Sequence, residues 1–504
     1  MSPISAVSIP VWERDFAEQE AGADWAVEGE REPVLRKGKG RAYRSGRGES
    51  RKSWRGKGWY LYLLSGFALG ETAVQSFWLS FFLVCLCVPG NQPTPNQQPQ
   101  QPGANPTSTP PIPTAITPPN GTAGGGGSAA PIPFNHLLVD PNSGFGGGIA
   151  LGDIDGDGKL DVITAEGPTE LGNGQQSVVA WYANPGVEDQ GNWRKTIIDP
   201  QFGGSDDAQV ADIRGNGVMD IITSDWGAGQ IVWYENPRNW GGNSFTDRWT
   251  RHVIGNGGLH DAAVGDVLGN GKIDVVVHGY FAAFHNEPGP TVLYIQNNPD
   301  SWTAVTMVNA PDNNGNGKGI ALANLAGHTN GKLDLVENGY WLEQSSDPTN
   351  GNAWTAHVFD SSGPVQAAVA VADINGDGRL DIVMDASDGL PGQLAWYEQG
   401  SGDPRNATNW TQHLIDASIN SSHNLSIADM NQDGHLDIVF GEGGAKRIGF
   451  LLNNGDGSSW TLQLISPTNG GRPQVGDIGG DKDLDIVGTR DDNVPVDVWY
   501  NQSK

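Results

Sequence analysis

Aspartates at alternate positions form the most chemically distinctive pattern in the C-terminal part of this sequence. The first copy, D-x-D-G-D-G-x-x-D, consists of Asp153, Asp155, Asp157 and Asp161. The two glycines allow the backbone to fold back tightly, so the carboxylates can face a common centre. Carboxylate oxygens joined by a backbone carbonyl are the donors that Ca²⁺ prefers, and without a cation they would repel each other. The pattern therefore predicts a calcium site.

Related loops follow along the chain with different degrees of completeness. Two keep an oxygen donor in all four slots, namely Asp373, Asn375, Asp377 and Asp381, and Asp429, Asn431, Asp433 and Asp437. A third copy is partial, with Asp477, Asp481 and Asp485 but Gly479 in the second slot. Three others are degenerate, because Arg214 or Leu268 replaces a ligand or because the loop starts at Asn324. We expect calcium in the complete and partial copies, and metal-free turns in the other three.

An EF-hand is the obvious alternative for such a loop. Its twelfth position carries a glutamate that binds calcium through both oxygens. This sequence has Thr164, Met384 and Phe440 there, and strand-like residues follow instead of an amphipathic helix. The loops are therefore interpreted as turns between β-strands.

The loops recur with a period that indicates a repeating fold. The seven copies begin at Asp153, Asp212, Asp266, Asn324, Asp373, Asp429 and Asp477. A period near 50 residues with about four strands is typical of a propeller blade. Each copy has a small apolar strand before the loop and an LDIV-like strand after it. We therefore predict an all-β, seven-bladed β-propeller over residues 134–504, with the calcium loops in its inner hairpins.

Aromatic residues and histidines also recur in register. A Trp-Tyr strand, seen at Trp181, Trp233, Trp396 and Trp499, follows each loop, with looser versions at Leu293, Tyr340 and Phe450. A W-T-x-H-like strand comes last, and its histidines are His136, His252, His357 and His413. Residues repeated blade after blade are interpreted as architectural. Residues 135–139 form an unpaired outermost strand, and we expect them to complete the last blade beside residues 496–500, which closes the ring.

The charge of the propeller region restricts its partners. Residues 134–504 contain 18 Lys and Arg against 48 Asp and Glu. Nucleic acid is not expected as a partner, since phosphate binding needs a basic surface. Both cysteines, Cys85 and Cys87, precede this region, so it can form no disulfide.

The N-terminal part is interpreted as a targeting or membrane-anchoring segment that is followed by a linker. Residues 1–58 are basic and are predicted to be disordered, and residues 59–89 contain an apolar stretch, strongest at 72–88. This stretch suits a signal peptide or a membrane anchor, and whether it is cleaved is left open. Residues 90–133 are rich in Pro, Gln and Gly and form a linker. We therefore expect an extracytoplasmic protein, either secreted or held at the cell surface by this membrane segment.

The complete loops in registered repeats resemble the FG-GAP/VCBS family, whose members include the integrin α-chain propeller. The resemblance covers residues 134–504 and implies that the calcium loops lie on one face and have a structural role. The FG…GAP signature survives only faintly, at Phe145-Gly146. Integrin-like ligand binding is therefore not carried over.

A ligand site is expected at the mouth of the propeller axis, on the face opposite the calcium loops. The residues that open each innermost strand should line it. The candidates are Asp206, Asp207, His260, Asp261, Lys318, Gln366, His423, Asn424 and Arg472. These groups could bind a sugar acid, hold a second metal or perform acid–base work, although loop residues are often polar for no other reason.

No catalytic motif such as G-x-S-x-G or H-E-x-x-H is present in the sequence. The leading functional hypothesis is therefore a calcium-stabilised binding or adhesion module for an extracellular glycan or protein. The alternative is a carbohydrate-active enzyme, a lyase or dehydratase, whose active site lies at the axial mouth. A passive spacer is the third possibility.

Overall fold

The structure is a computed structural model. It describes residues 131–503 apart from 168–176, 189–190, 206, 257–258, 281–287, 308–318, 363–366, 387–392, 417, 420–421, 444–445, 467–470 and 490–493. The predicted disordered region, membrane segment and most of the linker lie outside the described residues. Within the described ranges, no helix is long and apolar enough to cross a membrane.

Antiparallel strands form seven blades, and the all-β propeller prediction is confirmed. Blade 1 consists of the second half of β1 (Phe134–Gly152), β2 (Asp161–Gly167), β3 (Val179–Ala183) and β4 (Arg194–Asp199). Blade 2 consists of β5 (Ala208–Ala211), β6 (Asp220–Asp225), β7 (Gln230–Glu235) and β8 (Thr250–Asn256). Blade 3 consists of β9 (Leu259–Gly265), β10 (Asp274–Tyr280), β11 (Pro288–Asn298) and β12 (Ser301–Thr306).

The remaining blades repeat this order from the innermost strand outward. Blade 4 consists of β13 (Ala321–Ala323), β14 (Asp334–Glu337), β15 (Tyr340–Glu343) and β16 (Thr355–Val358). Blade 5 consists of β17 (Ala367–Ala372), β18 (Asp381–Ala386), β19 (Leu394–Gln399) and β20 (Trp410–Asp416). Blade 6 consists of β21 (Ser422–Ala428), β22 (Asp437–Glu442), β23 (Arg447–Asn453) and β24 (Trp460–Ser466). Blade 7 consists of β25 (Gln474–Gly476), β26 (Asp485–Gly488), β27 (Val494–Asn501) and the first half of β1.

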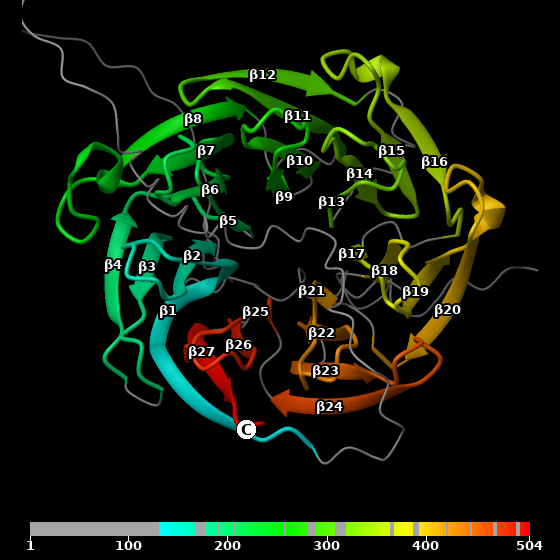
Figure 1. The fold of residues 1–504 in the computed structure, drawn as a ribbon. Helices are drawn as coiled ribbons and strands as arrows, with labels where there is room; N and C mark the ends of the chain where they lie inside the picture. The colour runs from blue at the N-terminus through cyan, green and yellow to red at the C-terminus, as the bar shows by residue number, and fades with distance from the viewer. Residues whose placement is uncertain are drawn as a thin grey trace, which may run out of the picture. The chain divides into compact units, whose positions relative to one another are not determined.

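The innermost strands surround a common axis, as Figure 1 shows for this part of the chain. Each one contacts the next in the order β1, β5, β9, β13, β17, β21 and β25, and β25 contacts β1 again. Every innermost strand runs from the mouth of the axis toward the aspartate loop that connects it to the second strand. The seven aspartate loops therefore share one face, and the residues that open the innermost strands share the opposite face.

The ring closes through β1, which serves two blades. Its first half pairs antiparallel with β27, with Asn135 opposite Tyr500, and its second half pairs with β2. Blades 7 and 1 therefore form one continuous seven-stranded sheet. The predicted closure by residues 135–139 is confirmed, and it leaves no free strand edge between the first and last blades.

Apolar side chains fill the spaces between neighbouring blades. One cluster joins Ile163 and Trp181 of blade 1 to Ile221 and Tyr234 of blade 2, and all four side chains are buried. Equivalent clusters follow around the ring. Each blade thus depends on both neighbours to bury its faces, as expected for a closed repeat fold.

The histidines of the outermost strands have the architectural role that the sequence predicts. His252, His357 and His413 each lie opposite a tryptophan of the third strand, with ring centroids 4.2–4.5 Å apart. Each Nε2 also lies 2.9–3.0 Å from a glutamate two residues after that tryptophan. The repeated histidine therefore joins the two outer strands of a blade.

Two residues of the predicted Trp-Tyr alignment are wrong by one position. In blade 7, Val498 lies opposite Val487 at the place that Trp181 takes in blade 1, so Trp499 corresponds to Tyr182. In blade 4, Trp341 rather than Tyr340 takes the place of Trp181. The error arose because any large apolar residue suits either buried face of a third strand, and the strand register depends on the hairpin lengths.

Candidate calcium loops and the axial mouth

The first aspartate loop connects β1 to β2 and brings three carboxylates together. One oxygen from each of Asp153, Asp155 and Asp161 lies within 4.8 Å of the other two. Asp153 also accepts hydrogen bonds from the backbone amides of Gly156 at 2.6 Å and Gly158 at 2.9 Å. Both glycines have positive φ, 77° and 87°, so the tight turn that the sequence predicted is present.

Negatively charged side chains lie close together in this loop. Burial and the neighbouring carboxylates of Asp157 and Asp153 raise the pKa of Asp155. The fourth predicted ligand, Asp157, lies outside the three-carboxylate group, and its Oδ2 is 2.5 Å from Lys159 Nζ. A basic residue thus already neutralises Asp157, whereas the other three carboxylates converge on one another.

In the loops of blades 5 and 6, as in blade 1, the first aspartate accepts from the backbone amide of the glycine five residues later. Asp373 accepts from the amides of Asp377 at 2.9 Å and Gly378 at 2.8 Å, and Asp429 accepts from those of Asp433 and Gly434 at 3.0 and 2.8 Å. In blade 5, Asp377 pairs with Arg379 just as Asp157 pairs with Lys159. The second-slot asparagines, Asn375 and Asn431, offer amide oxygens in place of a carboxylate.

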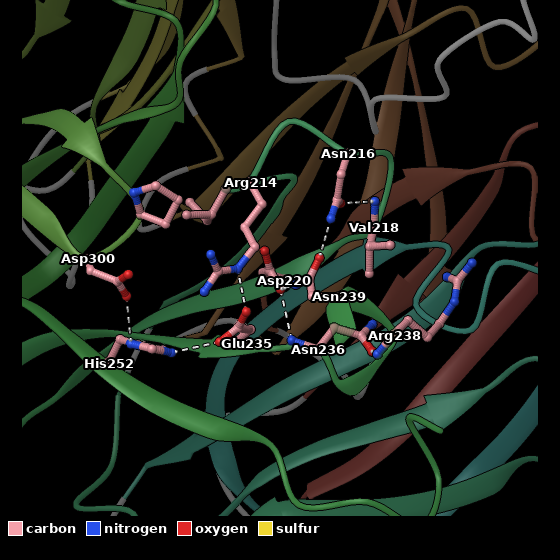
Figure 2. A network of polar contacts seen from close by, with 12 residues as sticks. Arg214, Asn216, Val218, Asp220, Glu235, Asn236, Arg238, Asn239, His252 and Asp300 are labelled. Atoms are coloured by element: carbon pink, nitrogen blue, oxygen red, sulfur yellow. Dashed lines mark hydrogen bonds and ion pairs between the residues drawn. The ribbon is translucent and has the colours of Figure 1, made fainter. Parts of the chain in front are cut away.

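The loop of blade 2 shows how a degenerate copy keeps its shape. Asp212 accepts from the amides of Asn216 and Gly217 at 3.0 and 2.6 Å, as in the complete loops. Arg214, in the second slot, forms an ion pair with Glu235, which also contacts His252 (Figure 2). A guanidinium group therefore takes the place of a ligand oxygen, and this loop is not suited to a cation.

The other two degenerate loops also depend on protein contacts. In blade 3, Asp266 accepts from the amides of Asn270 and Gly271 at 2.8 and 2.6 Å. In blade 4, His328 Nε2 lies 2.9 Å from Asp334 Oδ1, and Asn324 bonds to the backbone of His328. That these three loops fold without metal stays a prediction.

The last aspartate of each loop is buried and belongs to a sevenfold pattern. These aspartates are Asp161, Asp220, Asp274, Asp334, Asp381, Asp437 and Asp485. Each one accepts a hydrogen bond, 2.8–2.9 Å long, from the backbone amide of an Asn or Gln at or near the end of the third strand. Burial raises the pKa of Asp161, Asp381 and Asp485 to about 7 and that of Asp437 to about 8.

The Asn and Gln residues of this pattern also join neighbouring blades. Asn236 Nδ2 of blade 2 donates to Ile154 O of blade 1 at 2.8 Å, and Asn184 Nδ2 of blade 1 donates to Ile478 O of blade 7 at 2.9 Å. The same bond occurs at Gln296, Gln344, Asn453 and Asn501. The sequence analysis missed these residues, although an Asn or Gln closes the third strand in all seven repeats, as in WYAN, WYEN and WYEQ.

At the mouth face, charged residues from three blades come together. Arg472 Nη1 of blade 7 lies 3.6 Å from Asp261 Oδ1 of blade 3. Asp207 of blade 2 lies beside Asp261, since its Oδ2 accepts from the amide of Ala262. Burial and the carboxylate of Asp261 raise the pKa of Asp207 to about 7, and Arg472 opposes that rise. The predicted convergence of mouth residues is therefore present for these three.

The same aspartates also connect adjacent innermost strands. Asp207 Oδ2 accepts from the amide of Ala262 at 2.7 Å, and Asp261 Oδ2 accepts from that of Gly319 at 2.6 Å. In blade 6, Asn424 Nδ2 donates to Pro473 O at 3.1 Å. The mouth residues are thus held rigidly by the fold, and part of their hydrogen-bonding capacity serves the ring itself.

Other predicted mouth residues are only partly placed. His423 opens β21 beside Asn424 and is half-buried. His260 lies in β9, but its side chain is outside the described part of the structure. Asp206, Lys318 and Gln366 lie in the ranges that the structure does not describe.

The donor chemistry of the complete loops fits a calcium ion. In blade 1 the converging groups are carboxylate oxygens, and the blade 5 and blade 6 loops carry carboxylate and amide oxygens in the same slots. Nitrogen and sulfur donors, which softer metals prefer, do not occupy these slots. The blade 7 loop offers Asp477, Asp481 and Asp485, but Gly479 leaves its second slot without a side chain.

Comparisons with known proteins agree with the repeat structure. A family model described as an FG-GAP-like repeat matches residues 153–223 and 429–488. No curated protein matches the chain. Solved structures that resemble it include two crystal structures of BBS1N in complex with ARL6DN, one soaked with mercury and one with lead.

The two solved structures cover 74% of this chain and 97% or 98% of their own chains, with TM-scores of 0.44 and identities of 10% and 8%. Likeness at that level carries no argument about function. The two matched stretches start at the aspartate loops of blades 1 and 6. The chain is therefore a seven-bladed β-propeller in which residues 153–223 and 429–488 resemble the FG-GAP-like repeat.

Proposed function

We propose that this protein is a calcium-stabilised binding module, displayed outside the cytoplasm, that holds a glycan or protein ligand at the axial mouth. The observation that carries the proposal is the meeting of Asp207, Asp261 and Arg472 from three different blades at one end of the axis. Rigidly held polar groups that converge from separate elements are typical of a ligand site. Backbone amides fix both aspartates, so little order would be lost on binding.

The opposite face has the structural role. Asp153, Asp155 and Asp161 would hold calcium in blade 1, and the equivalent oxygens of the blade 5 and blade 6 loops would do so there. Bound calcium supplies positive charge that offsets the repulsion between these carboxylates. Six of the seven loops accept a hydrogen bond from an Asn or Gln amide of a neighbouring blade, so an ordered loop also supports that blade.

The competing function is catalysis on a carbohydrate by a lyase or dehydratase. One observation favours it, namely that the pKa of Asp207 is raised to about 7, a value suited to proton transfer at neutral pH. His260 and His423, which open two innermost strands, would be the other acid–base candidates. The absence of a recognised catalytic motif from the sequence favours the binding module.

The test uses the full chain, a panel of polysaccharides and glycans, and the His260→Ala and His423→Ala variants. The binding module predicts glycan or protein binding that these variants weaken, with no turnover of any polysaccharide. His435→Ala, on the aspartate-loop face, is the matched control and should bind normally. Turnover that is lost in both mouth variants, with an unchanged calcium-dependent melting temperature, would establish the enzyme instead. If the wild-type chain binds no ligand, the remaining possibility is that the protein is a passive spacer.

A further inference from the structure

A pocket of about 460 Å³ opens at the blade 4 loop, on the aspartate-loop face. Its wall consists of residues 327–330 and 332 of the loop and of residues 344–346, which follow β15. This volume lies in the range of pockets that hold small molecules. The wall contains no carboxylate and no apolar side chain, although Asp and Glu far outnumber Lys and Arg in the propeller region. Such a wall suits a polar ligand that carries no positive charge.

Lys332 brings a positive charge to this pocket that the protein does not neutralise. In three other blades the basic residue at the same loop position is already bonded, namely Lys159 to Asp157, Arg379 to Asp377 and Lys272 to Asn297 O. In blade 4, Asn330 stands two residues before Lys332, where blades 1 and 5 have an aspartate. The Lys332 side chain forms no ion pair or hydrogen bond with any residue that the structure describes. Its ammonium group is therefore available to a ligand.

His328 adds a second nitrogen to the pocket wall. Its Nε2 lies 2.9 Å from Asp334 Oδ1, and the Asp334 side chain has no exposed surface. Asn324 holds the backbone of His328 through two hydrogen bonds of 2.6 Å, so the imidazole has a fixed place. Nδ1 makes no hydrogen bond within the described ranges. A protonated imidazole donates from both nitrogens, so Nδ1 remains to donate to an anion.

Neutral polar groups complete the wall. Thr329 and Ser346 are exposed, and their hydroxyl groups bond to no other described residue. Gln344 is buried, and its Nε2 donates to the backbone carbonyls of Val267 and Leu333. Gln344 Oε1 accepts no hydrogen bond from the described part of the chain. The pocket therefore offers donors and acceptors together, a combination that matches the hydroxyl groups of a sugar.

We infer that this pocket binds an acidic sugar, whose carboxylate or sulfate group contacts Lys332 and His328 and whose hydroxyl groups contact the neutral part of the wall. Hydrogen bonds between charged partners are about twice as strong as those between neutral ones, so the two nitrogens favour an anion. The acidic side chains elsewhere on the protein do not prevent binding, because salt screens charges beyond about 8 Å. The site lies on the face opposite the mouth, so it depends neither on a ligand there nor on calcium.

Calorimetry with the full chain tests the site directly. Glucuronate, glucose 6-sulfate and glucose are titrated into the wild type, Lys332→Met and Lys332→Arg. We expect the wild type to bind at least one of the two acidic sugars more tightly than glucose, and the tighter one identifies the acidic group. Lys332→Met, which keeps most of the aliphatic stem, should weaken that binding by about tenfold or more, whereas Lys332→Arg should retain most of it. The matched control, Lys272→Met at the same loop position of blade 3, should leave the affinity unchanged.

Thermal unfolding gives a second measurement on the same proteins. A saturating acidic sugar should raise the melting temperature of the wild type and of Lys272→Met, and should raise that of Lys332→Met less. No binding of either acidic sugar, equal affinity for glucose, or equal effects of Lys332→Met and Lys272→Met would overturn the site. Binding that is lost in His260→Ala and kept in Lys332→Met would support the proposed function at the mouth and overturn this site alone.

Discussion

His136 lies opposite Trp499, and its Nε2 is 2.7 Å from Asp497 Oδ1. The imidazole stacks on the indole with ring centroids 5.3 Å apart. His136 belongs to the first strand of the described structure and the other two residues belong to the last. Pairing between the two ends of the folded chain therefore closes the propeller, without any covalent bond.

Deleting residues 134–140 tests this closure. The deletion removes the outermost strand of blade 7 and exposes the edge of β27, so the melting temperature should fall by about 10 °C or more. Circular dichroism during heating gives the measurement. Deleting residues 101–107, an equally long piece of the predicted linker, is the control and should have no effect. An unchanged melting temperature after the first deletion would contradict the closure.

Asn236→Ala tests the bonds between blades. Asn236 Nδ2 donates to Ile154 O of the preceding blade and to Met219 O of its own, and all of these groups are buried. Both buried carbonyls lose the Asn236 donor, and Ile154 O keeps only the guanidinium of Arg238, so the free energy of unfolding should fall by about 2–4 kcal/mol. Urea unfolding measures the change. Asn297→Ala, which alters an exposed amide bonded only to Ser301 and Thr303, should change it by less than about 0.5 kcal/mol. Equal effects of the two substitutions would refute the structural role of the buried amide.

Arg472→Met tests the charge cluster at the mouth. The substitution leaves the carboxylates of Asp207 and Asp261 close together without their guanidinium, and we expect a loss of about 3 kcal/mol in unfolding free energy. Asp261→Asn in the same chain should recover part of the loss. The matched control is Arg405→Met, which breaks an exposed pair with Glu343 and should cost about 1 kcal/mol or less. A loss no larger than that of the control would mean that the three charges are not coupled.

The buried aspartates predict how pH affects stability. The pKa values of Asp161, Asp381 and Asp437 are raised from 3.8 to about 7 or 8, so the folded protein binds their protons more tightly than the unfolded chain does. Stability of the calcium-free protein should therefore fall as pH rises from about 4 to about 8. Calcium needs the charged carboxylates, so the rise in melting temperature that it causes should be larger at pH 8 than at pH 5. Thermal scans at both pH values check this, and an equal rise would contradict it.

The sequence allowed the architecture to be predicted because the aspartate loops mark every blade. Seven loops at a period near 50 residues gave the number of blades, and the unpaired strand at residues 135–139 gave the closure. The positions of Trp499 and Trp341 were wrong by one residue, since an apolar strand alone does not define its register.

The candidate site was less accessible to sequence reasoning, because its parts meet only in three dimensions. The sequence placed Asp207 and Asp261 beside innermost strands, but their bonds to Ala262 and Gly319 depend on how neighbouring strands pack. The Asn and Gln bonds between blades could have been found, because one of these residues closes the third strand in every repeat.

Calcium titration of the full chain, followed by thermal unfolding with and without chelator, tests the central claim most directly. The account predicts about two to four bound ions, contributed by the loops of blades 1, 5, 6 and 7, and a melting temperature that falls in chelator. Asp153→Asn, Asp373→Asn and Asp429→Asn should each remove or weaken one site, whereas Asp212→Asn should leave the number of ions unchanged. No bound calcium, together with a melting temperature that chelator does not alter, would contradict the account.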